Sequence, residues 1–171
     1  MVAKNSSVSV IKFDAVKIKT SESLEVIIGQ GNFTVKTIDD LYACVFQSSK
    51  DVKFGVAMNE AKPRLTRVAG NDGELKKLAG DAALRIGAGH VFVIYLRNAF
   101  PIHVMNSVKS HPCIACIFAA TSNPCEVIVA NTALGRAVVG VVDGTSANAI
   151  ENETQKKERR ELVKKFGYVP E

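Results

Sequence analysis

The run of six apolar residues from Val91 to Leu96 restricts the fold more than any other stretch of this chain. Apolar runs of this length, bounded by turn residues, are typical of strands that are buried on both faces. The segment before the run predicts a helix, and Gly87 stands where glycine commonly ends one. The apolar stripe of this helix comprises Leu75, Leu78, Ala79, Ala82 and Ile86. We therefore expect a buried central strand in a sheet with helices packed on it.

The other elements are predicted from apolar periodicity and from turn and capping residues. Helices are expected after a Thr37 cap, after Asn71 or Asp72, after Pro101 and from about residue 151. The remaining strands are expected at residues 8–19, 24–31, 52–61, 64–70, 113–121, 125–132 and 136–144. The sequence thus predicts an α/β (mixed α+β) fold, with a mixed sheet of about eight strands and about four helices.

The length and composition are those of one soluble globular domain. The 171 residues suffice for a single core, and 47% of them are hydrophobic while 23% are charged. We expect one domain over residues 1–171, with residues 1–7 flexible and residues 151–171 forming a C-terminal helix and tail.

Charge and hydropathy narrow the class of partner. The net charge of +5 is spread thinly and forms no basic block interleaved with aromatic residues, so we expect no nucleic-acid partner. No apolar window is long enough to span a membrane, and the N-terminal stretch lacks the apolar region of a signal peptide. We therefore expect no membrane association and a cytoplasmic location.

The four cysteines are expected to be reduced in the cytoplasm. Cys113 and Cys116 form a Cys-x-x-Cys motif directly after His111. However, the surrounding residues predict a strand, in which positions three apart point to opposite faces, and no second such motif is present. Buried free thiols are the favoured interpretation, and no metal site is expected.

Two phosphate-binding motifs can be excluded. The chain has no G-x-x-x-x-G-K-[ST] loop, and the Gly87-Ala88-Gly89 stretch lacks the third glycine of a dinucleotide fingerprint and precedes a strand. These glycines are instead interpreted as a sharp turn that allows a close approach to the main chain.

The three histidines differ in their expected surroundings. His103 falls in the first turn of the short helix and His111 at its end, so both are expected at the surface or in a cap. His90 begins a buried row beside the glycine turn. From the residues alone, a core-edge histidine satisfied by a backbone carbonyl is the favoured interpretation, with a nucleophile or phosphoacceptor as the alternative.

Polar side chains gather at the predicted strand ends. Carboxylates, amides and arginines in such a set suit sugar hydroxyls and a phosphate, because they supply both acceptors and cationic donors. The helix after Pro101 offers a second anion site at its N-terminus. The polar residues at these ends are Asn59, Glu60, Arg64, Arg97, Asn98, Asn123, Glu126, Arg136 and Asp143.

Several long motifs together resemble the adenosine-specific kinase family. They are "KFGVAMNEAKPRLTR", "GND", "GAGHVFVIYLRNAFPIHVMN", "CIFAATSNPCEVIVA" and "GRAVVGVVDG", and the similarity covers about residues 8–168. The resemblance implies a compact α/β protein that binds adenosine and AMP, carries a stably phosphorylated histidine and assembles as a homo-oligomer, a trimer or hexamer.

The family motifs map onto individual positions of this chain. The Gly-His before the apolar strand falls on Gly89 and His90, which makes His90 the phosphoacceptor candidate. The second histidine, His103, stands where the family more often has asparagine, so it is the other phosphorylation candidate. The remaining matched positions are Asn59, Glu60, Asn123, Pro124, Glu126, Arg136, Asp143 and Gly144.

Two functions are consistent with these features. The first is an adenosine/AMP-binding kinase that acts through a phosphohistidine at His90, with Arg136 or Arg97 and Mg²⁺ from the phosphoryl donor neutralising charge. In it, Glu60 or Asp143 would orient the ring or accept a ribose hydroxyl. The second is a non-catalytic AMP or adenosine sensor or scaffold, which the absence of a recognisable catalytic dyad favours.

Overall fold

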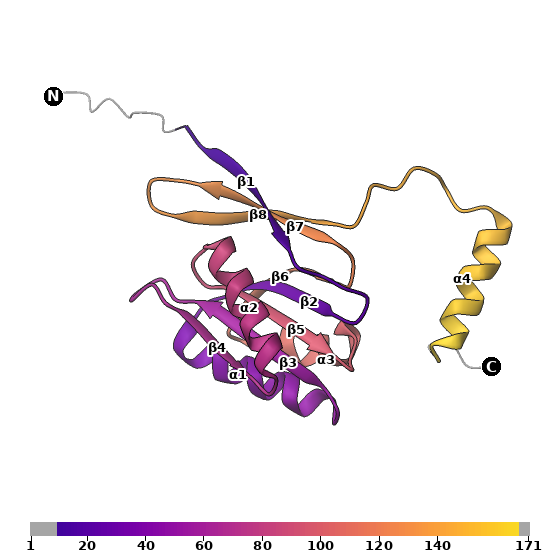
Figure 1. The fold of residues 1–171 in the computed structure, drawn as a ribbon, viewed down its shortest axis with the longest axis horizontal. Helices are drawn as coiled ribbons and strands as arrows, with labels where there is room; N and C mark the ends of the chain where they lie inside the picture. Colours follow the sequence, from indigo (N-terminus) through magenta and orange to yellow (C-terminus); the bar gives the residue numbers. More distant parts are fainter. Residues whose placement is uncertain (1–9, 168–171) are drawn as a thin grey trace.

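The computed structural model describes residues 10–167, which form eight strands and four helices (Figure 1). The expected flexible segment at residues 1–7 lies outside the described residues, as do residues 168–171 of the expected tail. The strands are β1 (Lys12–Ile18), β2 (Glu25–Gly31), β3 (Lys53–Asn59), β4 (Thr66–Gly70), β5 (Val91–Arg97), β6 (Ile114–Thr121), β7 (Cys125–Asn131) and β8 (Arg136–Asp143). The helices are α1 (Thr34–Ser48), α2 (Gly73–Ile86), α3 (Pro101–Lys109) and α4 (Glu153–Lys165).

The mixed α+β class and the number of elements are confirmed, but the strands form two antiparallel sheets instead of one mixed sheet. The larger sheet has the order β4-β3-β5-β2-β6, and the smaller has the order β1-β7-β8. The smaller sheet exists because β7 and β8 form a hairpin and β1 pairs along the other edge of β7, from Lys12 opposite Asn131 to Ile18 opposite Cys125. Such long-range pairing leaves no local signal in the sequence.

Strand β5 lies at the centre of the five-stranded sheet and is buried on both faces, as its apolar run predicts. Its alternate residues enter two different cores. Val93 and Tyr95 pack with α2 and with the inner face of the three-stranded sheet. Phe92 and Ile94 pack with α1 and α3 on the opposite face. The five-stranded sheet is therefore the middle layer, as Figure 1 shows.

Helix α1 begins one turn before the expected cap at Thr37. Its N-cap is Phe33, which has no side chain able to cap. The hydroxyl of Thr37 instead donates to the carbonyl oxygen of Phe33, inside the helix. The prediction was wrong because threonine can bond back to the preceding turn as readily as it caps a helix start.

The predicted ends of α2 are confirmed in detail. The Asp72 carboxylate accepts a 3.0 Å hydrogen bond from the Leu75 amide, and Gly87 ends the helix with a left-handed φ of 69°. At α3, Nδ1 of His103 accepts a 3.1 Å hydrogen bond from the Phe100 amide, so His103 is a capping residue. The Gly87 cap fixes where the glycine turn before β5 begins, and the His103 cap fixes the start of α3.

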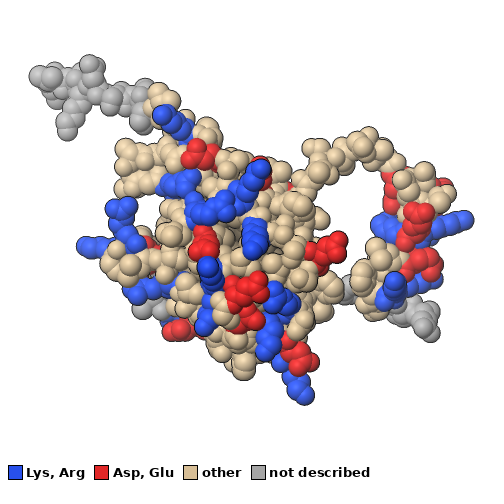
Figure 2. All heavy atoms as spheres, in the orientation of Figure 1, with Lys and Arg blue, Asp and Glu red and all other residues tan. Residues whose placement is uncertain are grey.

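Helix α4 stands apart from the two sheets at the end of an extended segment (Figure 1). None of its residues is buried, and a ring contact of 6.2 Å joins Phe166 at its end to Phe100. No helix within residues 10–167 is long and apolar enough to cross a membrane. Figure 2 shows basic and acidic side chains intermixed on the face in view, including the surface of α4.

Candidate functional site

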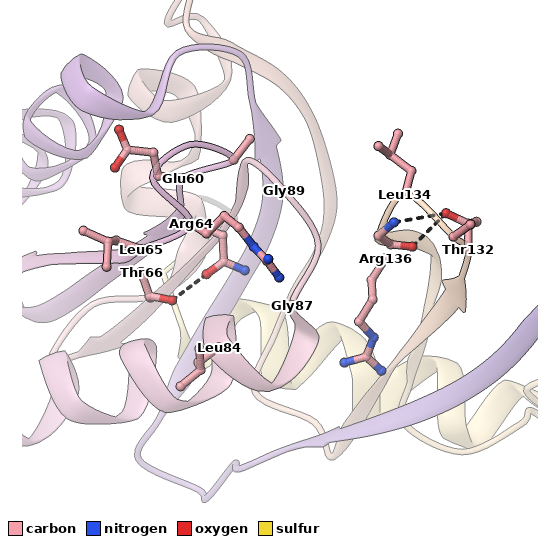
Figure 3. Close-up of a pocket in the computed structure, with 14 residues that line it drawn as sticks. Glu60, Arg64, Leu65, Thr66, Leu84, Gly87, Gly89, Thr132, Leu134 and Arg136 are labelled. Atoms are coloured by element: carbon pink, nitrogen blue, oxygen red, sulfur yellow. Dashed lines mark hydrogen bonds between the residues drawn. The ribbon is translucent and has the colours of Figure 1, made fainter.

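A cavity of about 930 Å³ lies between three segments that are distant in sequence. One wall is the turn between β3 and β4, the next is the end of α2 with the glycine turn, and the third is the turn between β7 and β8 (Figure 3). Its size is in the range of small-molecule sites. Five of the sequence-predicted site residues line it: Asn59, Glu60, Arg64, Gly89 and Arg136.

Asn59 holds the first two walls together. Its side-chain amide donates to the carbonyl oxygens of Ala83 at 2.8 Å and Ala88 at 2.9 Å, and its Oδ1 accepts from the Thr66 hydroxyl at 2.8 Å. The residue is buried, with 8% of its surface exposed. Because its donors and acceptor face protein groups, Asn59 positions the cavity walls.

The glycine turn places His90 at the edge of the cavity. The amide of His90 donates to the Asn59 carbonyl and its own carbonyl accepts from the Gly31 amide, both at 2.9 Å. The left-handed residues of the turn are Gly87 and His90, whose φ values are 69° and 58°. Gly89 lines the cavity, but the half-buried His90 is not among its lining residues.

Glu60 lines the cavity from the β3–β4 turn, but its carboxylate points away from the space between the walls (Figure 3). Its side chain is only 8% exposed, and both Nε and Nη2 of Arg67 approach the same oxygen, Oε2, at 2.8 and 2.6 Å. Within the described residues, no hydrogen bond engages Oε1. Arg67 does not line the cavity, so a ligand hydroxyl would reach this carboxylate only after a rotation of the Glu60 side chain.

Two arginines bring positive charge to the cavity. The guanidinium of Arg64 points into the space between the walls (Figure 3), and no residue of the described chain engages it. Arg136 donates from Nη1 to the Arg85 carbonyl at 2.7 Å and from Nη2 to Asp14 at 3.0 Å. Its Nε has no partner among residues 10–167, but it is buried out of reach of a ligand. Nη1 and Nη2 each keep a second N–H, and the side chain is 27% exposed. Both arginines can therefore still take up an anion.

Three predicted residues form a separate group. Oδ1 of Asp143 accepts from the Thr121 hydroxyl at 2.7 Å and from the side-chain amide of Asn123 at 3.1 Å. Asn123 and Glu126 line a second, smaller cavity of about 510 Å³. This group sits at the Asp143 end of β8, whereas Arg136 starts that strand. At about 3.3 Å per residue, the two groups lie more than 20 Å apart.

The structure also separates Arg97 and Asn98 from His90. Arg97 ends β5, and His90 immediately precedes that strand, so its length of seven residues lies between them. Arg97 forms a 3.2 Å ion pair with Glu74 of α2, and Asn98 takes a left-handed φ of 63° in the turn toward α3. The expected anion site at the α3 N-terminus therefore belongs to the opposite end of the sheet.

Sequence reasoning missed the third wall of the cavity. The turn between β7 and β8 contributes Thr132 and the fully exposed Leu134, and the end of α2 contributes Leu84. Asp14, which pairs with Arg136, was also missed. No sequence signal links these positions, because β1 and β8 meet only through long-range pairing with β7.

The cysteines depart from the expected burial. All four are free thiols, but Cys116 is exposed and Cys44 and Cys113 are half-buried. Cys116 is exposed because β6 is an edge strand of the larger sheet. Cys125 is buried, and desolvation raises the pKa of its thiol to about 11. Burial likewise raises the pKa of Tyr95, whose hydroxyl donates to the Lys19 carbonyl at 2.7 Å.

Comparisons with known proteins agree with this architecture. The model of a family described as adenosine specific kinase matches residues 16–169 of the chain. The chain is 56% identical to the PH1918 protein from Pyrococcus horikoshii OT3. The crystal structure of that protein superposes with a TM-score of 0.92, covering 95% of this chain and 100% of the other. No curated protein matches.

Proposed function

This chain belongs to the adenosine-specific kinase family, and from that premise we propose that it binds adenosine or AMP in the 930 Å³ cavity. One observation carries the proposal. Arg64 has no partner in the described chain, Arg136 keeps a second N–H on each terminal nitrogen, and both line the same cavity. Two available guanidinium groups on facing walls suit the phosphate of AMP.

The rest of the cavity suits a nucleoside. A rotation of the Glu60 side chain would bring Oε1, which Arg67 leaves without a hydrogen bond, to a ribose hydroxyl. Leu65, Leu84 and Leu134 line the cavity and are largely exposed, which leaves apolar surface for a planar base. Apolar walls with a few placed polar groups are typical of small-molecule sites.

Phosphoryl transfer would use His90 in two balanced steps. A ring nitrogen attacks the phosphorus of a donor, so that an N–P bond forms and the bond to the donor oxygen breaks. The adenosine 5′-hydroxyl then attacks the phosphohistidine, the N–P bond breaks, and the hydroxyl proton passes to a base or water. Mg²⁺ would arrive with the donor phosphates. Gly89, the residue before His90, lines the cavity, so the imidazole ring would have to extend past this one residue to reach a bound ligand.

The second candidate is a sensor that binds AMP without turnover. The position of His90 favours it, because its ring is not among the groups that line the cavity. In this case the arginines and Glu60 would bind the nucleotide, and the occupied cavity would change a contact with another protein. The two candidates share the binding site and differ only in the phosphoryl step.

One pair of experiments tests both steps. Isothermal titration calorimetry with adenosine and AMP tests the cavity, and AMP should bind more tightly to the wild type than to Arg64→Gln. Intact mass and phosphate analysis after incubation with labelled donors tests His90, with His90→Ala and His103→Gln compared. Phosphate on wild type and His103→Gln but not on His90→Ala supports the kinase. AMP binding without phosphate uptake leaves the sensor, and no binding refutes the site.

We also propose that the chain works as a cytoplasmic homo-oligomer, a trimer or hexamer. Phe13 and Val142 lie on the outer face of the three-stranded sheet and are 62% and 48% exposed, which leaves apolar surface for a second copy. Light scattering of the purified chain at several concentrations tests this assembly. A monomer at all concentrations would refute it without affecting the nucleotide site.

A further inference from the structure

A carboxylate, an imidazole and a thiol meet where α1 faces the turn between α3 and β6. They belong to Asp40, His111 and Cys113, and one ligand atom of each lies within 4.8 Å of the other two. The side chains of Asp40 and His111 are 18% and 22% exposed, and Cys113 is half-buried. We propose that these three residues bind a divalent transition metal such as Zn²⁺, with the remaining coordination position open to water.

The donor set selects the class of metal. Zn²⁺ binds thiolate sulfur, imidazole nitrogen and carboxylate oxygen, and sites with three protein ligands commonly keep one open position. Mg²⁺ and Ca²⁺ prefer oxygen ligands alone, so a thiol in the set disfavours them. The site therefore differs in chemistry from any Mg²⁺ that accompanies a phosphoryl donor.

The main chain that carries two of the ligands is held by the surrounding backbone. The Ile114 amide donates to the His111 carbonyl at 3.0 Å, which closes the turn. Asn32 donates from its backbone amide to the Cys113 carbonyl at 2.9 Å and from its side chain to the Pro112 carbonyl at 3.0 Å. The imidazole and thiol thus project from a fixed turn, and small side-chain rotations would bring them to a common metal.

Metal binding would require two contacts of the ligand side chains to give way. Nζ of Lys36 lies 2.8 and 2.9 Å from the two Asp40 oxygens, but the lysine side chain is 60% exposed, and exposed ion pairs of this kind contribute little. Nδ1 of His111 accepts a 3.2 Å hydrogen bond from the Cys113 amide. A metal at Nδ1 would take the place of this bond, and a metal at Nε2 would leave the proton on Nδ1, which could then no longer accept. Both contacts are weak beside three metal–ligand bonds.

The site also changes the meaning of the Cys-x-x-Cys motif. Only Cys113 belongs to the cluster, whereas Cys116 lies exposed on β6 and pairs in register with Gln30 of β2. The third ligand, Asp40, comes from α1, far away in sequence. A motif search would therefore assign the wrong pair of ligands.

Co²⁺ titration of the reduced, chelator-treated full chain tests the proposal. Bound Co²⁺ should produce visible bands of a tetrahedral site and a near-ultraviolet thiolate charge-transfer band, and Zn²⁺ should displace it. The charge-transfer band should be lost in Cys113→Ser, and Asp40→Asn and His111→Gln should each weaken Co²⁺ binding at least about tenfold. Circular dichroism checks that each variant folds, and Asp40→Asn still tests the site if Cys113→Ser does not fold.

Matched variants locate the metal. Cys116→Ser and Cys44→Ser remove the neighbouring thiols, and both should keep the charge-transfer band. Lys36→Gln removes the competing ammonium and should bind Co²⁺ at least as tightly as the wild type. His90→Ala should bind it equally, which separates this site from the proposed phosphohistidine. Absence of the band in the wild type or its persistence in Cys113→Ser would overturn the proposal. Its loss in Cys116→Ser, Cys44→Ser, Lys36→Gln or His90→Ala would overturn it as well.

Discussion

The side-chain amide of Asn59 donates a 2.9 Å hydrogen bond to the carbonyl oxygen of Ala88, and this bond ties the end of β3 to the turn before His90. The same nitrogen holds the Ala83 carbonyl near the end of α2. A single buried amide thus joins a strand, a helix end and a turn, which together form two walls of the cavity.

Replacing Asn59 with aspartate should destabilise the fold strongly. The carboxylate cannot donate, so the Ala83 and Ala88 carbonyls would keep only their backbone partners, the amides of Gly87 and Val91. Each carbonyl would also face a buried negative charge, and together these losses should cost about 2–4 kcal/mol in the free energy of unfolding. Urea unfolding measures this loss. Thr66→Val is the control, because it removes only the hydroxyl that donates to Asn59, with an expected loss of about 1 kcal/mol. Equal losses in the two variants would contradict the bridging role of the amide.

Alanine should be costly at Gly87 and tolerated at Gly89. Gly87 has a left-handed φ of 69°, and a Cβ there would lie 3.1 Å from Cδ of Arg136. The backbone conformation alone should cost about 1–2 kcal/mol. A Cβ on Gly89 would meet only the Ala61 Cβ at 3.8 Å, an ordinary contact. Thermal unfolding of both variants checks this difference, and a larger loss for Gly89→Ala would show that the turn is assigned incorrectly.

Local signals predicted the elements well, and non-local relationships were missed. Asp72 and Gly87 cap α2 as expected because capping involves residues within one helical turn. The start of α1 was misplaced because Phe33 offers no capping side chain, whereas Thr37 resembles a cap. The division into two sheets depends on pairing of β1 with β7, over more than a hundred residues, which no local pattern encodes.

The candidate site was predicted in part for the same reason. Strand ends were recognised, but the sequence does not show which ends meet. Arg136 reaches the cavity because the β7–β8 turn lies over the end of α2, whereas Arg97 leaves β5 at the opposite end. The identity of the polar residues was therefore accessible from sequence, and their grouping required the fold.

This grouping predicts a difference between Arg64 and Arg97 in AMP binding. Arg64→Gln should weaken AMP binding about 10–100-fold, since hydrogen bonds to a charged group contribute about 1.5–3 kcal/mol, and should leave adenosine binding nearly unchanged. Arg97→Gln should leave both affinities unchanged, because Arg97 pairs with Glu74 away from the cavity. Calorimetry with both ligands measures these affinities. A comparable loss of AMP affinity in Arg97→Gln would place the phosphate at the other end of β5.

The buried Glu25 at the start of β2 should make stability depend on pH. It is 9% exposed, and desolvation raises the pKa of its carboxyl above the ordinary value of 4.5. The folded state therefore binds the Glu25 proton more tightly than the unfolded state does. The stability that this proton contributes is complete below pH 4.5 and is lost as pH rises through the raised pKa. Glu25→Gln should increase the free energy of unfolding at neutral pH and flatten its decline with pH.

Urea unfolding at several pH values from about 4 to about 7 measures this effect of Glu25, because carboxyl groups titrate within this range. Glu22→Gln is the charge-matched control, because it removes an exposed carboxyl from the same segment. The same gain in stability for both variants would point to net charge as the cause instead of desolvation.

The thiols should react at very different rates. Cys116 is exposed, whereas Cys125 is buried and has a pKa of about 11, two units above the ordinary value of 9.0. The thiolate fraction of Cys125 is therefore about a hundredfold lower than that of a thiol with the ordinary pKa, and burial also keeps reagents away from it. Labelling with Ellman's reagent at mildly alkaline pH should show a fast phase that Cys116→Ser removes. Cys125 should react only after denaturant is added, and fast labelling of Cys125 in the native chain would contradict its place in the core.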